Sequence, residues 1–116
     1  MLSVNYIRKS FFLLKMCSNE VYYACRRGIL KQLKQLIEKG ANVDVKDGYD
    51  YTLLHHAIYG ENLEIVKYLI ELGVDLDFPN FWGDTAFDYA CLIGNLEIIE
   101  YLGNLKLQKK YLFIEK

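Results

Sequence analysis

The stretch Asp47-Gly48-Tyr49-Asp50-Tyr51-Thr52-Leu53-Leu54-His55-His56-Ala57 decides the fold, because its pattern returns 33 residues later as Asn80-Phe81-Trp82-Gly83-Asp84-Thr85-Ala86-Phe87-Asp88-Tyr89-Ala90. In each copy a turn-rich run leads into a short apolar segment. A Gly or Asn break follows, and then a longer segment with apolar residues at i, i+3, i+6 and i+7, which is typical of a helix. The same period joins further triplets: Ala24, Ala57 and Ala90; Cys25, Ile58 and Cys91; Leu30, Leu63 and Leu96; Leu36, Leu69 and Leu102. Residues in register at one period predict a stack of one supersecondary unit, in which these apolar positions lie inside.

Small residues mark the close contacts and the ends of this unit. Ala24, Ala57 and Ala90 are small, which lets the two helices of a unit approach each other. Gly40 and Gly73 follow the longer helix, where a left-handed residue ends a helix at little cost for glycine. We expect each longer helix to end there.

Side chains that precede the helices are suited to capping them. Thr52 and Thr85 stand before the short helices, and Asn62 and Asn95 before the long ones. The first amides of a helix lack partners within the helix, and a hydroxyl or amide oxygen can accept from them. We expect all four side chains to do so.

The turn between the two helices has one irregular copy. Gly28 and Gly94 stand in equivalent positions, but the middle copy has Glu61 there, preceded by Gly60. A non-glycine residue in the left-handed region costs about 1 kcal/mol. We therefore expect the middle turn to shift by one residue, so that Gly60 takes that conformation.

These residues resemble the ankyrin repeat, whose mark is a β-turn, two helices and a T-P-L-H-x-A signature. Residues 52–57 match the signature except that Leu53 replaces the proline, and residues 85–90 match it more loosely. An earlier copy keeps the second helix and the closing Gly40-Ala41-Asn42. The resemblance covers about residues 18–103 in three repeats. It implies an all-α fold, a short α-solenoid of stacked helix-turn-helix units with β-turn or hairpin connections.

The period divides the chain into segments. We expect an N-terminal capping helix within residues 1–17, repeats over 18–46, 47–79 and 80–104, and a C-terminal cap or tail over 105–116. Lys106 stands where Gly73 ended the previous repeat. Because residues 111–114 are apolar, we expect the tail to fold back on the last helix.

Charge and cysteine content limit the partners and the compartment. Residues 47–104 carry one Lys against eleven acids, whereas residues 1–46 carry nine Lys or Arg against three acids. An acidic middle favours a basic protein and opposes phosphate, so we expect no nucleic-acid binding. No run is long enough to span a membrane. The three cysteines do not predict a disulfide framework. We expect a cytoplasmic monomer. The composition, rich in Tyr, Ile, Lys and Asn, suggests an AT-rich genome and, by analogy, delivery into a host cell.

The sequence offers little for catalysis or cofactors. His55 and Asp88 are equivalent positions of neighbouring repeats, whose backbones lie about 8–10 Å apart in packed helices, too far for a hydrogen-bonded pair without reorientation. The resemblance implies that His55 bonds to the turn backbone. Adjacent His55 and His56 diverge on a helix, and no Cys stands at ligand spacing. We expect no enzyme activity, no metal and no cofactor.

The resemblance places the turn tips and the exposed side of the first helix along a concave groove. Aromatic side chains at exposed positions are typical of interface hot spots. The predicted partner-binding residues are Tyr23, Tyr49, Tyr51, His56, Tyr59, Phe81, Trp82 and Tyr89. Two functions remain open: a module that binds another protein through this face, or a truncated repeat protein with a structural role and no dedicated partner. Packing of the tyrosines between repeats is the competing interpretation of these residues.

Overall fold

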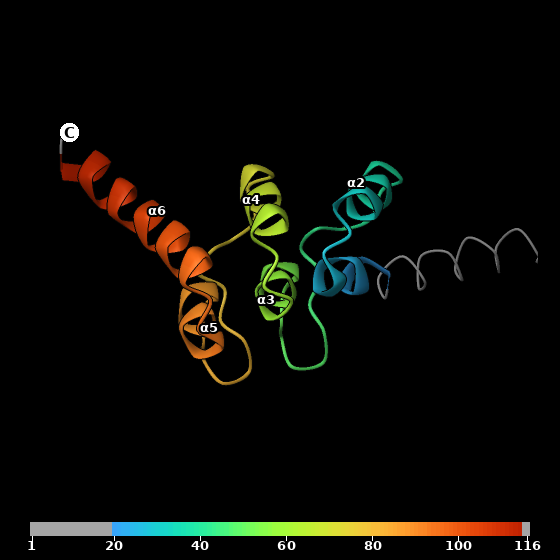
Figure 1. Cartoon of the computed structure of the whole chain (residues 1–116), viewed down its shortest axis with the longest axis horizontal. Coiled ribbons are helices and arrows are strands. Elements are labelled where there is room, and N and C mark those ends of the chain that lie inside the picture. The colour runs from blue at the N-terminus through green and yellow to red at the C-terminus, as the bar shows by residue number, and fades with distance from the viewer. Residues whose placement is uncertain (1–19, 115–116) are drawn as a thin grey trace, which may run out of the picture.

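The chain folds into three helix pairs stacked side by side. The structure, a computed structural model, describes residues 20–114, and side chains up to residue 109. A helix over 20–27 pairs with α2 (Leu30–Glu38), α3 (Leu53–Tyr59) with α4 (Leu63–Glu71), and α5 (Ala86–Ile93) with α6 (Leu96–Ile114). The first helix of each pair lies in one layer and the second in the other, and the connecting loops extend from the first layer (Figure 1). The predicted all-α solenoid is confirmed.

The loops that connect the pairs are turns rather than a sheet. Within the described residues the strand-like pairing is limited to one antiparallel bridge, Lys46 to Thr52. The backbone amide of Phe81 donates to the carbonyl of Tyr49 at 2.9 Å. Adjacent turn tips are thereby tied to each other, as the expected hairpin connections require.

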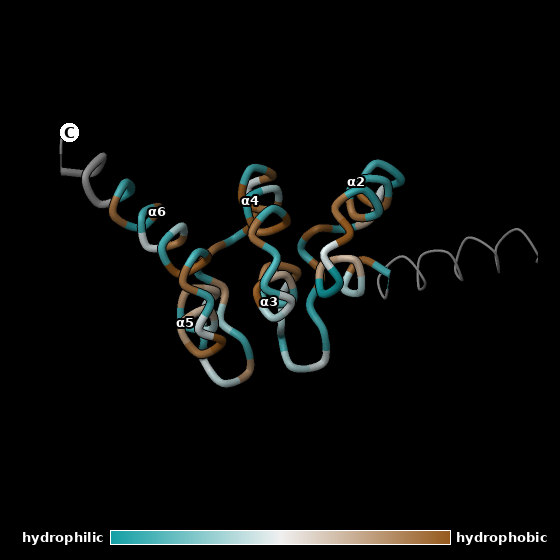
Figure 2. The backbone as a smooth tube through the Cα atoms, in the orientation of Figure 1, coloured by the Kyte–Doolittle hydropathy of each residue, from teal (hydrophilic) through white to brown (hydrophobic). Residues whose placement is uncertain are grey.

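The core runs through the stack at the positions that the period marks. Ala24, Ala57 and Ala90 are each 0% exposed, so these alanines do lie where a larger side chain has no room. Leu36, Leu69 and Leu102 are also buried. The apolar positions of the helix pairs alternate with polar ones along the tube (Figure 2).

The prediction that all the periodic apolar positions lie inside is wrong for the last repeat. Leu96 is 78% exposed, whereas Leu30 and Leu63 pack partly buried against the core. Cys91 is exposed as well, although Cys25 and Ile58 are fully buried. In a stacked array each repeat is covered by its neighbours, and within the described residues the third repeat has no successor. Cys25 and Cys91 are both free thiols.

The capping predictions hold for three of the four side chains. The hydroxyls of Thr52 and Thr85 accept from the amides of His55 and Asp88, and the Asn95 side chain accepts from the amide of Ile98 at 3.1 Å. Asn62 is different: it makes no capping bond.

The Asn62 side chain instead joins two repeats. Its amide donates to the carbonyls of Cys25, at 2.9 Å, and Arg26, at 3.3 Å. A Cβ on Gly28 or on Gly60 would collide with this arrangement, at Asn62 and at the Arg26 carbonyl respectively. Gly60 is therefore a glycine because the backbone of the preceding repeat approaches it.

The expected shift of the middle turn is wrong. Gly60 has φ −79°, and Glu61 takes the left-handed conformation at φ 57°, as Gly28 and Gly94 do in the other copies. The close approach fixes the position of Gly60, so the strain falls on Glu61. Gly40 and Gly73 do adopt positive φ, at 100° and 87°, and end their helices as predicted.

The third long helix does not end at the equivalent place. α6 continues from Leu96 to Ile114, so residues 105–114 extend the helix rather than folding back on it. Lys106, in place of the helix-ending glycine, resists the left-handed conformation. Its ammonium lies over the Phe87 ring at 4.2 Å. The predicted helix within residues 1–17 lies outside the described residues, and the division at residues 46, 79 and 104 stays a prediction.

Replacing Glu61 with Gly should raise the free energy of unfolding by about 0.5–1 kcal/mol, because glycine adopts φ 57° without the left-handed penalty. Urea unfolding followed by circular dichroism measures this. The control is Glu64→Gly, within the first turn of α4, which should destabilise. A loss of stability in Glu61→Gly would contradict the assignment of strain.

Replacing Lys106 with Gly should end α6 near that residue, as Gly73 ends α4. Hydrogen exchange of the amides over 107–114 should then become faster. Lys106→Ala removes the same contact with Phe87 but favours helix, so its exchange should stay close to that of the unchanged chain. Equal exchange in the two variants would show that the Gly-to-Lys difference does not set the length of α6.

Candidate functional site: an aromatic face at the turn tips

At the turn tips, side-chain hydrogen bonds add to the backbone bonds that close each turn. The Asp47 carboxylate accepts from the amides of Tyr49, at 2.9 Å, and Tyr51, at 3.0 Å. In the next repeat the Asn80 side-chain oxygen accepts from Trp82 and Asp84, both at 2.9 Å. Such Asx bonds hold a turn in one conformation. The backbone positions that carry the aromatic side chains of these turns are therefore fixed.

His55 fastens one repeat to the next. Its Nδ1 accepts from the Thr52 amide at 3.2 Å, so Nε2 carries the proton and donates to the Asp84 carbonyl at 3.0 Å. His55 is 1% exposed, and burial lowers its pKa, although the bond to Asp84 opposes this. The expected structural role of His55 is confirmed.

The pair that His55 and Asp88 suggested does not form. The Asp88 carboxylate accepts from the backbone and the hydroxyl of Thr85, its own cap. No group of three His, Cys, Asp or Glu side chains with metal-binding geometry exists among the residues described. No helix in the described region is long and apolar enough to cross a membrane.

His56 supports the turn rather than standing free. Its Nε2 donates to the second oxygen of Asp47 at 2.9 Å, and its ring lies 4.8 Å from that of Tyr22. The His56 side chain is 12% exposed. Burial lowers the pKa of His56, and the bond to Asp47 acts against that shift. The exposed area that His56 offers to a partner is therefore small.

Five of the predicted partner-binding residues share one hollow. A pocket of about 220 Å³ is lined by Tyr49, Tyr51, His56, Tyr59 and Tyr89, together with Arg26, Asp47 and His55. The rings of Tyr51 and Tyr89 pack edge to face at 5.3 Å in this pocket. Burial raises the pKa of Tyr89, so this phenol stays neutral. Asp47 is not among the predicted partner-binding residues; its position in the turn, equivalent to that of Asn80, was the available signal.

Trp82 connects the pocket to the exposed turn tips. Its ring stacks on that of Tyr49 at 5.6 Å and lies 5.9 Å from that of Tyr51. Phe81 meets Trp82 edge to face at 5.4 Å. We call the surface formed by these side chains the aromatic face; it consists of Tyr49, Tyr51, Tyr59, Phe81, Trp82 and Tyr89.

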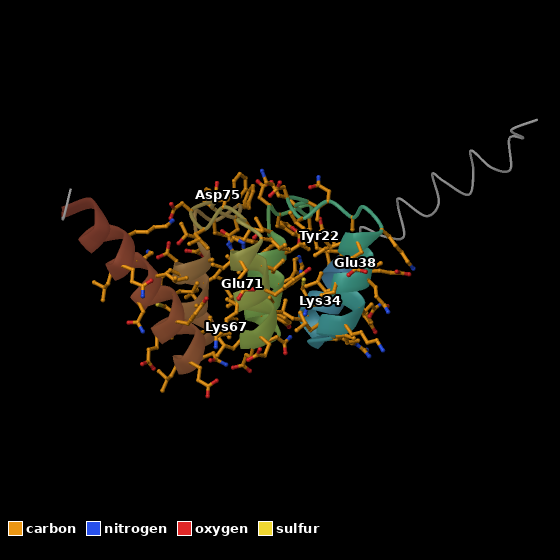
Figure 3. All side chains as sticks on the ribbon, turned by 90° about the horizontal axis from the view of Figure 1, so that it is seen from above. Tyr22, Lys34, Glu38, Lys67, Glu71 and Asp75 are labelled. Atoms are coloured by element: carbon orange, nitrogen blue, oxygen red, sulfur yellow. The ribbon has the colours of Figure 1, made fainter. Side chains whose placement is uncertain are left out.

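Tyr23 lies apart from these contacts. It is half exposed on the helix over 20–27, and its ring carries the guanidinium of Arg27 at 4.4 Å. The second helices form the opposite layer, where Figure 3 marks Lys34 and Glu38 on α2 and Lys67 and Glu71 on α4. The aromatic face and this charged layer thus belong to different helices.

A second hollow lies between the first and second connecting loops. It measures about 230 Å³ and is lined by residues of both loops and the start of α3, including Val43, Leu54 and Phe78. The Lys46 ammonium lies over the Phe78 ring at 3.4 Å. Its lining mixes aliphatic side chains with Asp44, Lys46 and Asp75, and the Lys46 cation already occupies the aromatic ring.

The chain belongs to the ankyrin-repeat family. A family profile described as "Ankyrin repeats (3 copies)" matches residues 21–111, which confirms the resemblance carried by residues 18–103. Ankyrin repeats are protein-interaction modules as a family, and the family is typically non-enzymatic. No curated protein matches the chain.

Solved structures do match it. One chain in the structure of the predatory endopeptidase Bd0816 from Bdellovibrio bacteriovorus, in complex with the immunity protein Bd3460, aligns with a TM-score of 0.68 at 30% sequence identity. The alignment covers 72% of the present chain and 44% of that chain. The present chain therefore spans less than half the length of this relative.

Acid should destabilise the fold through the two histidines. Burial lowers both pKa values below the ordinary 6.5, so the unfolded chain binds protons first. The stability that the neutral rings contribute is complete above about pH 6.5 and is lost as the pH falls toward the folded pKa values. Urea unfolding at pH 7.5 and at lower pH measures this dependence.

The matched variant for this measurement is His56→Gln, which keeps a donor for Asp47 but does not titrate. Its loss of stability between the two pH values should be smaller than that of the unchanged chain. Stability that is constant or rises on acidification would contradict the assignment of neutral, buried rings.

Proposed function

We propose that this chain is a protein-binding module and that its partner docks on the aromatic face. The observation that carries the proposal is exposure: Tyr49, Phe81 and Trp82 are 59%, 69% and 59% exposed although their rings contact each other. Rings packed together in water gain from a partner that covers them, because each buries a large apolar area. The family's general role as an interaction module supports this function rather than catalysis.

The fixed conformation of the turns favours binding. The Asp47 and Asn80 bonds hold the backbone of the turns, and the rings of Tyr49 and Trp82 contact each other, so less conformational freedom is lost when a partner docks. Trp and Tyr are the side chains that most often dominate protein interfaces. The structural relative is a chain of a complex between an endopeptidase and an immunity protein, which is compatible with a protein partner.

The remaining predicted contact residues have lesser roles in this proposal. Tyr51, Tyr59 and Tyr89 line the pocket, and the ring of Tyr59 carries the Arg26 guanidinium. His56 acts through Asp47 on the turn, and Tyr23 extends the surface toward the first repeat. We propose that Tyr49, Phe81 and Trp82 carry most of the binding energy.

Replacing Tyr49, Trp82 and Tyr89 together with Ala should abolish capture of the native partner while helicity stays unchanged. The test is an in-cell crosslinking pull-down analysed by mass spectrometry, with circular dichroism of each purified variant. The matched control is Leu72→Ala with Leu96→Ala and Leu107→Ala, which removes exposed apolar side chains outside the aromatic face. Capture that survives the aromatic substitutions would refute this contact surface.

The alternative, a truncated repeat protein without a dedicated partner, makes a different thermal prediction. A functional domain of three repeats should unfold in one cooperative transition, because each repeat is stabilised by its neighbours. A broad, non-cooperative transition would favour the alternative. Calorimetry of the full chain distinguishes the two.

A further inference from the structure

Six aromatic rings of the described region carry one of the chain's own cations. Among the five exposed aromatic residues of the described region, Tyr59 and Tyr23 carry a guanidinium, from Arg26 at 4.3 Å and Arg27 at 4.4 Å. Four partly buried rings carry a lysine: Tyr68, Phe78, Phe87 and Tyr101. The exposed rings of Tyr49, Phe81 and Trp82 are the exception in that region. A cation over an aromatic ring is favourable, most of all over Trp.

The three exposed rings without a cation form one cluster. Tyr49 and Trp82 stack with an interplanar angle of 24°, and Phe81 stands edge-on to Trp82 at 81°. The bond from the Phe81 amide to the Tyr49 carbonyl fixes the two turns beside each other. The cluster is therefore a preformed aromatic platform that extends across two repeats.

The two turns that carry this platform are acidic. Residues 47–66 and 68–105 contain no Lys or Arg, and the two turns carry Asp47, Asp50 and Asp84. Asp47 is occupied with its turn and with His56. No Lys or Arg of the described residues pairs with Asp50 or Asp84. The adjoining pocket does hold a cation, Arg26, but that guanidinium lies on Tyr59.

We propose that the platform of Tyr49, Phe81 and Trp82 receives an arginine side chain from an arginine-bearing segment of the partner protein. The planar guanidinium stacks on the rings, and Asp50 and Asp84 supply the neutralising charge. Arginine is favoured over lysine because it is more weakly hydrated and stacks over its whole plane. The inference rests on the proposed function, since it names the chemistry of the partner at the same face.

Trp82 makes the test direct, because it is the only tryptophan of the chain and its emission reports from the platform. The probe is an acetylated and amidated peptide of alternating Gly and Arg, titrated into the full chain. We expect a saturable change in emission, a weaker affinity for the Gly-Lys peptide, and none for the Gly-Glu peptide. No saturable change with the Arg peptide, or equal responses to all three, would overturn the proposal.

The charge requirement is tested with matched variants. Asp50→Asn with Asp84→Asn should raise the Kd of the Arg peptide about tenfold, since two nearby carboxylates are lost. Asn tolerates the left-handed conformation of Asp50, whose φ is 62°. The control, Glu64→Gln with Glu71→Gln on α4, removes the same net charge away from the platform and should change the Kd less than twofold. An equal increase in Kd for both double variants would show that the peptide is attracted by the overall charge of the chain. It would refute a specific site at the platform.

The two proposals can fail separately. If the aromatic triple variant loses the native partner but the Arg peptide does not bind and the crosslinked segment lacks arginine, the present inference fails and the proposed function stands. If the triple variant still captures the partner, the proposed function fails, whatever the peptide does.

Discussion

Each helix pair in this chain has an apolar flank that it cannot bury by itself, and the rest of the structure depends on how the next pair covers it. Cys25 and Ile58, at equivalent positions of the first two repeats, are fully buried, and each of these repeats is followed by another. In the third repeat Cys91 and Leu96 have the same chemical character but face water. Whether a given position is buried thus depends on whether a neighbouring repeat covers it, as expected for a one-dimensional array.

Polar side chains determine how closely the repeats approach. Asn62 reaches the carbonyls of the preceding repeat, and His55 reaches the carbonyl of Asp84 in the following one. Both side chains stand at the start of a helix, where they could have bonded only to the backbone of that helix. Because Asn62 requires the backbone at Gly60 to lie close, Glu61 takes the strained conformation. A local irregularity thus has a tertiary cause.

The aromatic face follows from the same turns that build the stack. The bonds from Asp47 and Asn80 shape each tip, and the link between Phe81 and Tyr49 joins the tips. Neighbouring repeats then place Tyr49 against Trp82, two residues far apart in the chain. A surface suited to a partner arises from this repetition of a turn.

The sequence by itself determined the repeat, the fold class and the helix-ending glycines, because these depend on spacing and on the conformational preferences of single residues. The structural role of His55 was implied by the resemblance to the ankyrin repeat. It also indicated the aromatic positions, although it could not show that Trp82 stacks on Tyr49 while Tyr23 stands apart. Only the tertiary structure decided that Asn62 binds the preceding repeat, that Glu61 bears the left-handed turn and that Leu96 is exposed. Those outcomes depend on which backbone or side chain lies next to a residue in space, and the period of a sequence carries no information about a neighbour that is absent or unusually close.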